Sequence, residues 1–98
     1  MIVEWSDRAR LRLHDIHDYI AVDSPSAARH TVERLILRSA GLSRLPRVDR
    51  RVPEYPEADL REVFERPWRL IYRISESPID IVTVKHYRQR LPSRPSAL

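Results

Sequence analysis

The side chains best suited to acid–base chemistry lie in the second half of the chain. Glu54 follows the segment Arg-Arg-Val-Pro, Arg69 lies in a β-rich stretch, and His86-Tyr87 closes the next such stretch. A carboxylate or an imidazole transfers protons, and a guanidinium binds two phosphate oxygens at once. These groups suit metal-free RNA cleavage, in which the neighbouring 2′-hydroxyl attacks the phosphorus, provided that adjacent strands bring them to one concave face. The candidate catalytic residues are therefore Glu54, Arg69, His86 and Tyr87.

Further cations are candidates for binding the phosphates of a substrate. They are Arg50, Arg61, Arg73, Lys85 and Arg88. Each candidate also has a structural alternative. Glu54 would then be a solvated loop carboxylate, and Arg61 and Arg69 would pair with a neighbour such as Glu62. His86 and Tyr87 would then serve in packing.

Other kinds of site are poorly supported. His14, His17 and Asp18 share one helical face, but a third inward metal ligand is not evident, so we expect no metal site. The chain has no cysteine for a thiolate zinc site or a nucleophile, and its one glycine, Gly41, cannot build a nucleotide-binding loop. We therefore expect no cofactor.

The charge balance favours an anionic partner. The net charge is +4, and all but one of the 18 lysine and arginine residues are arginine. Arginine pairs bidentately with phosphate and stacks on bases, although genomic base composition and a solvated surface explain arginine richness equally well. No apolar run approaches the roughly 20 residues that cross a bilayer, and no secretion signal opens the chain. We expect a cytoplasmic protein without a membrane partner.

The first half of the chain predicts a strand and two helices. Ile2–Trp5 is a short apolar run, and Ser6 and Ser24 are plausible N-caps, with Pro25 in the first turn of the second helix. Apolar residues recur at helical spacing after each cap, and the second stripe continues toward Leu45 and Pro46. A connection of about four residues predicts an antiparallel helical hairpin.

The second half predicts three short strands that cover this hairpin. The β-rich segments are residues 60–65, 68–75 and 79–86, of which the last two form a hairpin. Alternation places Leu70, Tyr72 and Ile74 toward the helices and Arg69 and Arg73 on an opposite, charged face. We expect one domain over residues 1–98, with a basic, proline-containing tail from about residue 88 that is mobile unless a ligand or partner orders it.

In this order the motifs strongly resemble those of the RelE/ParE superfamily of type II toxin–antitoxin toxins. The resemblance runs through nearly the whole chain and rests on Trp5-Ser6, 18–21, 24–28, Arg50-Arg51-Val52-Pro53-Glu54, Leu60-Arg61-Glu62, 68–74 and 84–88. It implies an α+β fold of order β-α-α-β-β-β, with the helical hairpin packed on a twisted antiparallel sheet. It also implies a cognate antitoxin that holds the protein inactive.

The superfamily divides by target, and fold alone does not choose between the targets. RelE and YoeB types cleave mRNA on the ribosome, whereas ParE types poison DNA gyrase. Glu54, Arg69 and His86-Tyr87 fall where YoeB-like toxins have a catalytic carboxylate, a phosphate-binding arginine and a C-terminal His-Tyr pair. RelE itself is less similar, because its active site relies on several lysines. The resemblance therefore favours a ribosome-dependent mRNA endoribonuclease, with gyrase inhibition by binding as the alternative.

Overall fold

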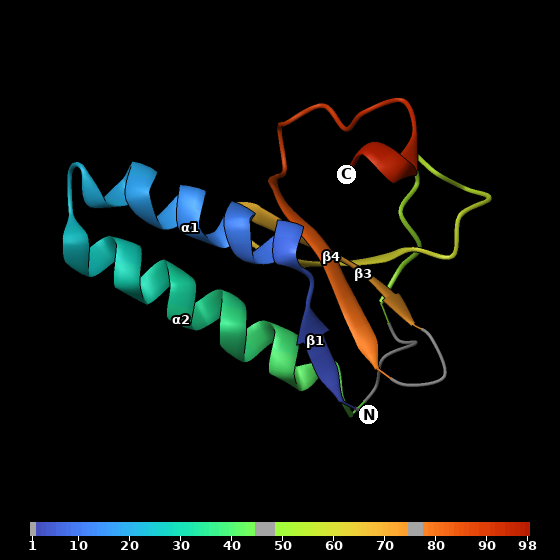
Figure 1. Ribbon diagram of the computed structural model, residues 1–98, viewed down its shortest axis with the longest axis horizontal. Helices are drawn as coiled ribbons and strands as arrows, with labels where there is room; N and C mark the ends of the chain where they lie inside the picture. The colour runs from blue at the N-terminus through green and yellow to red at the C-terminus, as the bar shows by residue number, and fades with distance from the viewer. Residues whose placement is uncertain (1, 45–48, 75–77) are drawn as a thin grey trace.

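The computed structural model describes residues 2–44, 49–74 and 78–98 and has an α+β architecture, as predicted (Figure 1). Two helices run side by side and cover one face of a four-stranded sheet. The elements in chain order are β1 (Val3–Trp5), α1 (Asp7–Ala21), α2 (Pro25–Gly41), β2 (Arg61–Glu65), β3 (Trp68–Ile74), β4 (Ile79–His86) and a 3-10 turn, η1 (Pro95–Ala97). No helix of the described residues is long and apolar enough to span a membrane.

The sheet is mixed, with strand order β1-β4-β3-β2. β3 pairs antiparallel with β2 and with β4, as expected for strands joined by short connections. β1 is the exception to the predicted antiparallel sheet, because it pairs parallel with β4, with Val3 opposite Ile79. A parallel neighbour requires a long crossover, which the helical hairpin and the other strands supply.

Both helices begin at the serine caps that the sequence predicts. The Ser6 hydroxyl accepts a hydrogen bond from the Ala9 amide at 3.0 Å, and the Ser24 hydroxyl accepts one from the Ala27 amide at 3.2 Å. Each cap satisfies one of the amides that a helix leaves unbonded at its start. The predicted extension of α2 toward Leu45 and Pro46 differs from the structure, in which α2 ends at Gly41; those two residues lie outside the described part of the chain.

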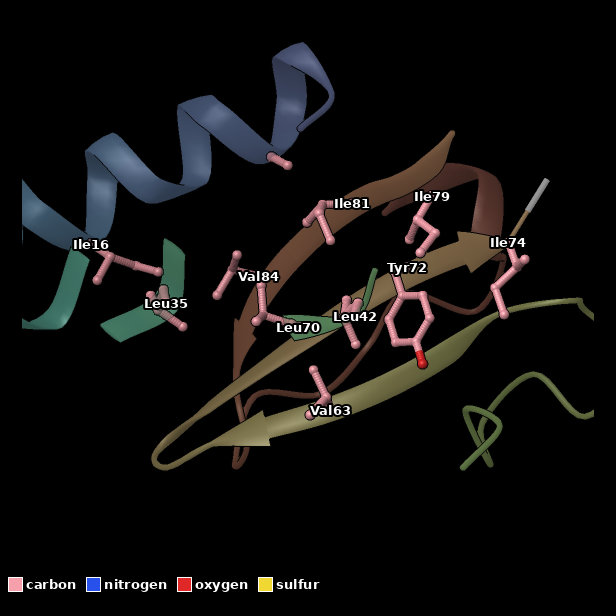
Figure 2. Close-up of a cluster of buried hydrophobic side chains, with 11 residues drawn as sticks. Ile16, Leu35, Leu42, Val63, Leu70, Tyr72, Ile74, Ile79, Ile81 and Val84 are labelled. Atoms are coloured by element: carbon pink, nitrogen blue, oxygen red, sulfur yellow. The ribbon is translucent and has the colours of Figure 1, made fainter. Parts of the chain in front are cut away.

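The main hydrophobic core lies between the helices and the sheet (Figure 2). Ile16 of α1 and Leu35 of α2 belong to one cluster with Leu70, Tyr72 and Val84, which come from the two central strands. The predicted helix-facing alternation of β3 is therefore confirmed. This cluster orients the helical hairpin against β3 and β4.

A second core covers the other face of the sheet, which we expected to present charge. Its residues come from β3, from the segment before β2 and from the C-terminal segment, and they are Val52, Tyr55, Leu60, Ile71, Leu91 and Leu98. The Tyr55 hydroxyl donates a hydrogen bond to the Pro92 carbonyl at 2.6 Å. The tail that we expected to be mobile is thus packed on the sheet. The physical reason is that Ile71, fully buried, requires an apolar cover on that face.

Candidate functional site

The Arg69 side chain lies at the centre of a buried ion network. Its Nη1 and Nη2 atoms donate to the two oxygens of Glu54 at 2.8 and 2.9 Å, which is the bidentate geometry that guanidinium and carboxylate prefer. Its Nε donates to Oε1 of Glu62 at 2.9 Å, and Nη2 also contacts that oxygen. With only 5% of its side chain exposed, Arg69 directs its whole fork at two carboxylates.

Glu62 links this network to a second arginine. Its side chain has no exposed surface, and its Oε2 accepts a hydrogen bond from Nε of Arg50. The Arg50 guanidinium also lies 5.3 Å from the centre of the Phe64 ring. Glu62 therefore satisfies its two oxygens with two different arginines, as a buried carboxylate requires.

The network shifts the ionisation of its members toward their charged forms. The hydrogen bonds from Arg69 lower the pKa of Glu54 against the opposing effect of burial. In return, the Glu54 carboxylate and then Glu62 raise the pKa of the Arg69 guanidinium. A carboxylate held ionised in this way is a weak proton acceptor at neutral pH.

The segment that carries Glu54 is fixed to the sheet beside the network. Nη1 of Arg61 donates to the Asp49 carbonyl at 2.8 Å, and the Tyr72 hydroxyl donates to Oδ2 of Asp49 at 3.2 Å. Burial, followed by the charge of Asp49, raises the pKa of Tyr72. Arg61, a candidate for substrate binding, thus makes a structural bond to the loop backbone.

His86 does not converge with Glu54 and Arg69. In the β3–β4 register Trp68 is opposite His86 and Arg69 is opposite Lys85. Side chains of consecutive strand residues point to opposite faces, so Trp68 and His86 lie on the helix-facing side and Arg69 on the other. The expectation that these catalytic candidates meet on one concave face is therefore wrong for His86.

His86 belongs instead to an aromatic group at the end of β4. Its ring meets Trp68 edge-on at 5.4 Å between ring centres and stacks on Tyr87 at 4.9 Å. The Arg88 amide donates to Nδ1 of His86 at 3.2 Å, and Nε of Arg88 donates to the Tyr87 hydroxyl at 2.7 Å. Tyr87 and Arg88 therefore lie beside His86.

The two remaining cation candidates lie apart. Arg73 is exposed near the other end of β3, opposite Asp80 of β4. Lys85 is buried, with 8% of the residue exposed. The five predicted substrate-binding cations are thus spread over several surfaces of the sheet.

On the helical face with His14, His17 and Asp18, two of these side chains are in polar contact. Nδ1 of His17 lies 3.1 Å from Oδ1 of Asp18. Among the described residues, no group of three His, Cys, Asp or Glu side chains could hold a metal ion.

Glu62 lies at the centre of the site, although we expected it only as a possible ion-pair partner of Arg61 or Arg69. The signal for its central position was present, because Arg66-Pro67 is a two-residue connection between β2 and β3. Such a connection pairs Phe64 with Arg69 and places Glu62 two residues further along the same face. The structural alternative for Arg69, pairing with Glu62, is the arrangement found.

Comparisons with known proteins give one consistent result. The family model described as "ParE toxin of type II toxin-antitoxin system, parDE" matches residues 3–91. The chain is 34% identical over 92 residues to the protein described as "Putative toxin Y4kP" from Sinorhizobium fredii (strain NBRC 101917 / NGR234), covering 92% of each chain. Its fold is similar to a chain of the structure "Chromosomal ParDE TA system from P. aeruginosa", with a TM-score of 0.73 and 22% identity over 88% of this chain and 95% of that one.

Proposed function

The chain belongs to the ParE toxin family of type II toxin–antitoxin systems, and from this premise we propose that it poisons DNA gyrase by binding and does not cleave RNA. A toxin of such a system has an antitoxin as its partner. An acidic antitoxin suits a chain of net charge +4, because complementary charge speeds association. Gyrase and the antitoxin would both be met in the cytoplasm.

The observation that carries the proposal is the state of Arg69. The RNA-cleavage hypothesis assigns this guanidinium to the scissile phosphate, but its fork is already occupied by Glu54 and Glu62. To bind a phosphate, Arg69 would have to leave a carboxylate partner in a largely buried site. For Glu62, whose side chain is fully buried, breaking such an ion pair costs roughly 3 to 5 kcal/mol, whereas the half-exposed Glu54 contributes less. We therefore assign Arg69 and Glu54 a structural role.

The placement of His86 supports the same function. General acid–base cleavage requires a base and an acid within reach of one phosphodiester. Glu54 contacts Arg69, whose side chain leaves the sheet on the face opposite His86, so Glu54 and His86 are not positioned as such a pair. A toxin that acts by binding needs a recognition surface and no acid–base pair.

The test measures both activities on the same protein preparations. We expect the purified chain to inhibit supercoiling by DNA gyrase and to leave mRNA intact in a translation reaction. Glu54→Gln and His86→Ala should keep inhibition within about twofold of the unchanged chain, since neither group acts in chemistry. Circular dichroism confirms that each variant is folded before it is assayed.

The mRNA endoribonuclease is the alternative that this experiment tests. It predicts codon-linked breaks in the mRNA and a loss on the order of a hundredfold in His86→Ala, the size of a general acid–base contribution. Such breaks, together with unimpaired supercoiling, would overturn the proposal. Inhibition of gyrase that disappears in His86→Ala, with the fold intact, would also contradict it.

A further inference from the structure

A cavity of about 360 Å³ lies where β3 begins and β4 ends, beneath α1. Its strand residues Trp68 and His86 belong to the helix-facing side of the sheet, whereas Lys85 is opposite Arg69 in the register. Because β1 pairs only with Ile79–Ile81, Lys85 lies at an edge of β4 that β1 does not cover, and from this edge it also lines the cavity. The lining residues that matter here are Arg12, Ile16, Trp68, Lys85, His86 and Gln89. They combine cationic and amide groups with an aromatic and aliphatic wall.

Lys85 is a buried cation that has no counter-ion among the residues that the structure describes. Only 8% of the residue is exposed, and within residues 2–44, 49–74 and 78–98 its ammonium makes no hydrogen bond or ion pair. Burial, followed by the charges of Arg12 and Arg8, lowers its pKa. A buried charge that faces like charges is costly unless an anion offsets it.

Arg12 also lines this cavity and carries an unsatisfied donor. Its Nε is buried and has no hydrogen-bond partner among the described residues. Its Nη1 lies 3.6 Å from Oδ2 of Asp15, the acidic residue on the cavity rim. That pair is exposed, with 42% and 63% of the two side chains accessible, so Asp15 only partly offsets the positive charge.

His86 and Gln89, which also line the cavity, each keep a donor group available. The Arg88 amide donates to Nδ1 of His86, so the neutral imidazole carries its proton on Nε2. The His86 amide donates to Oε1 of Gln89 at 3.4 Å, which leaves the NH₂ group of Gln89 as a donor. An anion with several acceptor oxygens matches a cavity of this character.

The shape and the apolar wall indicate what the anion is attached to. Inorganic phosphate would leave most of the cavity empty, and Trp68 and Ile16 would then gain nothing from its binding. A flat aromatic body beside the anion would bury this wall and contact the Trp68 and His86 rings. A phosphate monoester carries about −1.5 to −2 charges at neutral pH. It therefore neutralises two cations more completely than a single carboxylate does.

We propose that this cavity is a nucleotide site that takes a phosphate monoester on Lys85 and Arg12 and the attached nucleobase against Trp68. The ligand is a free mononucleotide or the terminal phosphate and base of a nucleic-acid strand, since the two share this chemistry. The inference goes beyond gyrase binding and is independent of it, because nucleotide binding is measured on the toxin alone.

The experiment follows the fluorescence of Trp68 while ligand is added to the full chain. Trp5, the other tryptophan, donates to the Ser39 hydroxyl away from this cavity, so a Trp5→Phe background isolates the signal of Trp68. The ligands are adenosine 5′-monophosphate, adenosine, inorganic phosphate, and a trinucleotide with or without a 5′-phosphate. We expect saturable binding of the monophosphate, and at least about tenfold weaker binding of adenosine and of inorganic phosphate.

A matched pair of variants tests the role of the buried ammonium. Lys85→Met keeps the length of the side chain and should weaken nucleotide binding at least about tenfold, because it removes a charge-assisted hydrogen bond. Arg29→Met removes one exposed cation from α2 and should bind like the parent. Circular dichroism checks both folds, and Lys85→Met is expected to fold, since it replaces a buried charge by an apolar group.

The measurements with the trinucleotides distinguish the two sources of the phosphate. Tighter binding of the 5′-phosphorylated trinucleotide than of the monophosphate assigns the site to a strand end, and the reverse assigns it to a free nucleotide. Equal binding of inorganic phosphate and nucleotide would overturn the proposal, as would binding unaffected by Lys85→Met or no binding at all. Lys85-dependent binding of an oligoglutamate peptide, without nucleotide binding, would also overturn it and assign the cavity to a protein carboxylate.

Discussion

At the scale of single residues, Glu62 holds the two arginines of the ion network together. Its fully buried carboxylate accepts hydrogen bonds from Arg50 and from Arg69. Glu62→Gln keeps the volume but removes the charge and leaves Arg69 with Glu54 alone. We expect the free energy of unfolding, measured by urea denaturation, to fall by about 3 kcal/mol, because a partner is lost from a buried pair.

A control for this variant comes from an exposed ion pair of the same segment. Asp59 lies 4.0 Å from Nη2 of Arg51, with 65% of its side chain exposed. Asp59→Asn should cost less than about 1 kcal/mol. Equal losses for Glu62→Gln and Asp59→Asn would contradict the view that burial makes the Glu62 network important.

Glu54 predicts how stability depends on pH. Its pKa in the folded chain is lowered by Arg69 from the usual 4.5, so the unfolded chain takes up its proton first as pH falls. The stabilisation is therefore complete above about pH 6 and is lost as the pH falls through the folded value. Because 41% of this side chain is exposed, we expect less than about 1 kcal/mol.

The measurement compares urea unfolding at about pH 6 and about pH 3 in the unchanged chain and in Glu54→Gln. The variant cannot lose this carboxylate interaction and should show the smaller decrease on acidification. A decrease as large as that of the unchanged chain would mean that the Glu54–Arg69 pair does not contribute through its charge.

The sequence identified the members of the site better than their roles. Glu54 and Arg69 were singled out as chemically capable and do meet, but as partners of each other. A motif gives the residue types and cannot show whether a guanidinium is occupied. Whether Arg69 is occupied depends on Glu62, and only the strand register shows that the Glu62 side chain lies on the same face of the sheet as Arg69. His86 was misplaced for the same reason, since one position along β4 changes the face of the sheet.

At the scale of the elements, the serine caps predict different costs for two similar substitutions. The Ser6 hydroxyl caps α1 and also donates to the Val82 carbonyl at 3.2 Å, which joins the helix to β4. The Ser24 hydroxyl caps α2 at an exposed turn. Ser24→Ala should cost about 1 kcal/mol, and Ser6→Ala about 2 kcal/mol because it also leaves a backbone acceptor unpaired.

Thermal unfolding followed by circular dichroism measures both cap variants under one buffer condition. Each variant serves as the control for the other, because both substitutions remove a serine hydroxyl from the N-cap position of a helix. A larger loss in Ser24→Ala than in Ser6→Ala would contradict the inferred tie between α1 and β4.

The elements with a regular period were predicted closely, and the irregular segments were not. The strand segment 79–86 and both caps agree with the structure, because alternation and capping chemistry are local signals. Val52, Leu60 and Leu91 lie in irregular segments, where no period indicates which way a side chain points. The arginines and prolines around Leu91 suggested a mobile tail, although its apolar residue is buried.

At the scale of the whole molecule, the sheet is covered on both faces. Leu70 and Ile71 are consecutive residues of β3, and both are fully buried, one in each core. In a chain of 98 residues a second core adds buried surface that one face of a four-stranded sheet would not provide. The helical hairpin and the C-terminal segment are therefore held by the same central strands.

This architecture predicts that the two cores unfold together. Ile79→Val trims the core beneath the helices, and Ile71→Val trims the core beneath the C-terminal segment; both isoleucines are fully buried. Each substitution should lower the free energy of unfolding by about 1 kcal/mol. The double variant should lower it by the sum of the two losses within about 0.5 kcal/mol, since the clusters share no side chains.

Unfolding in urea tests whether the cores melt together. Circular dichroism and tryptophan fluorescence should give one coincident transition with an unchanged slope, because the two cores share strands and neither core can melt alone. Separate transitions in Ile71→Val would instead mean that the C-terminal cover detaches from a sheet that stays folded.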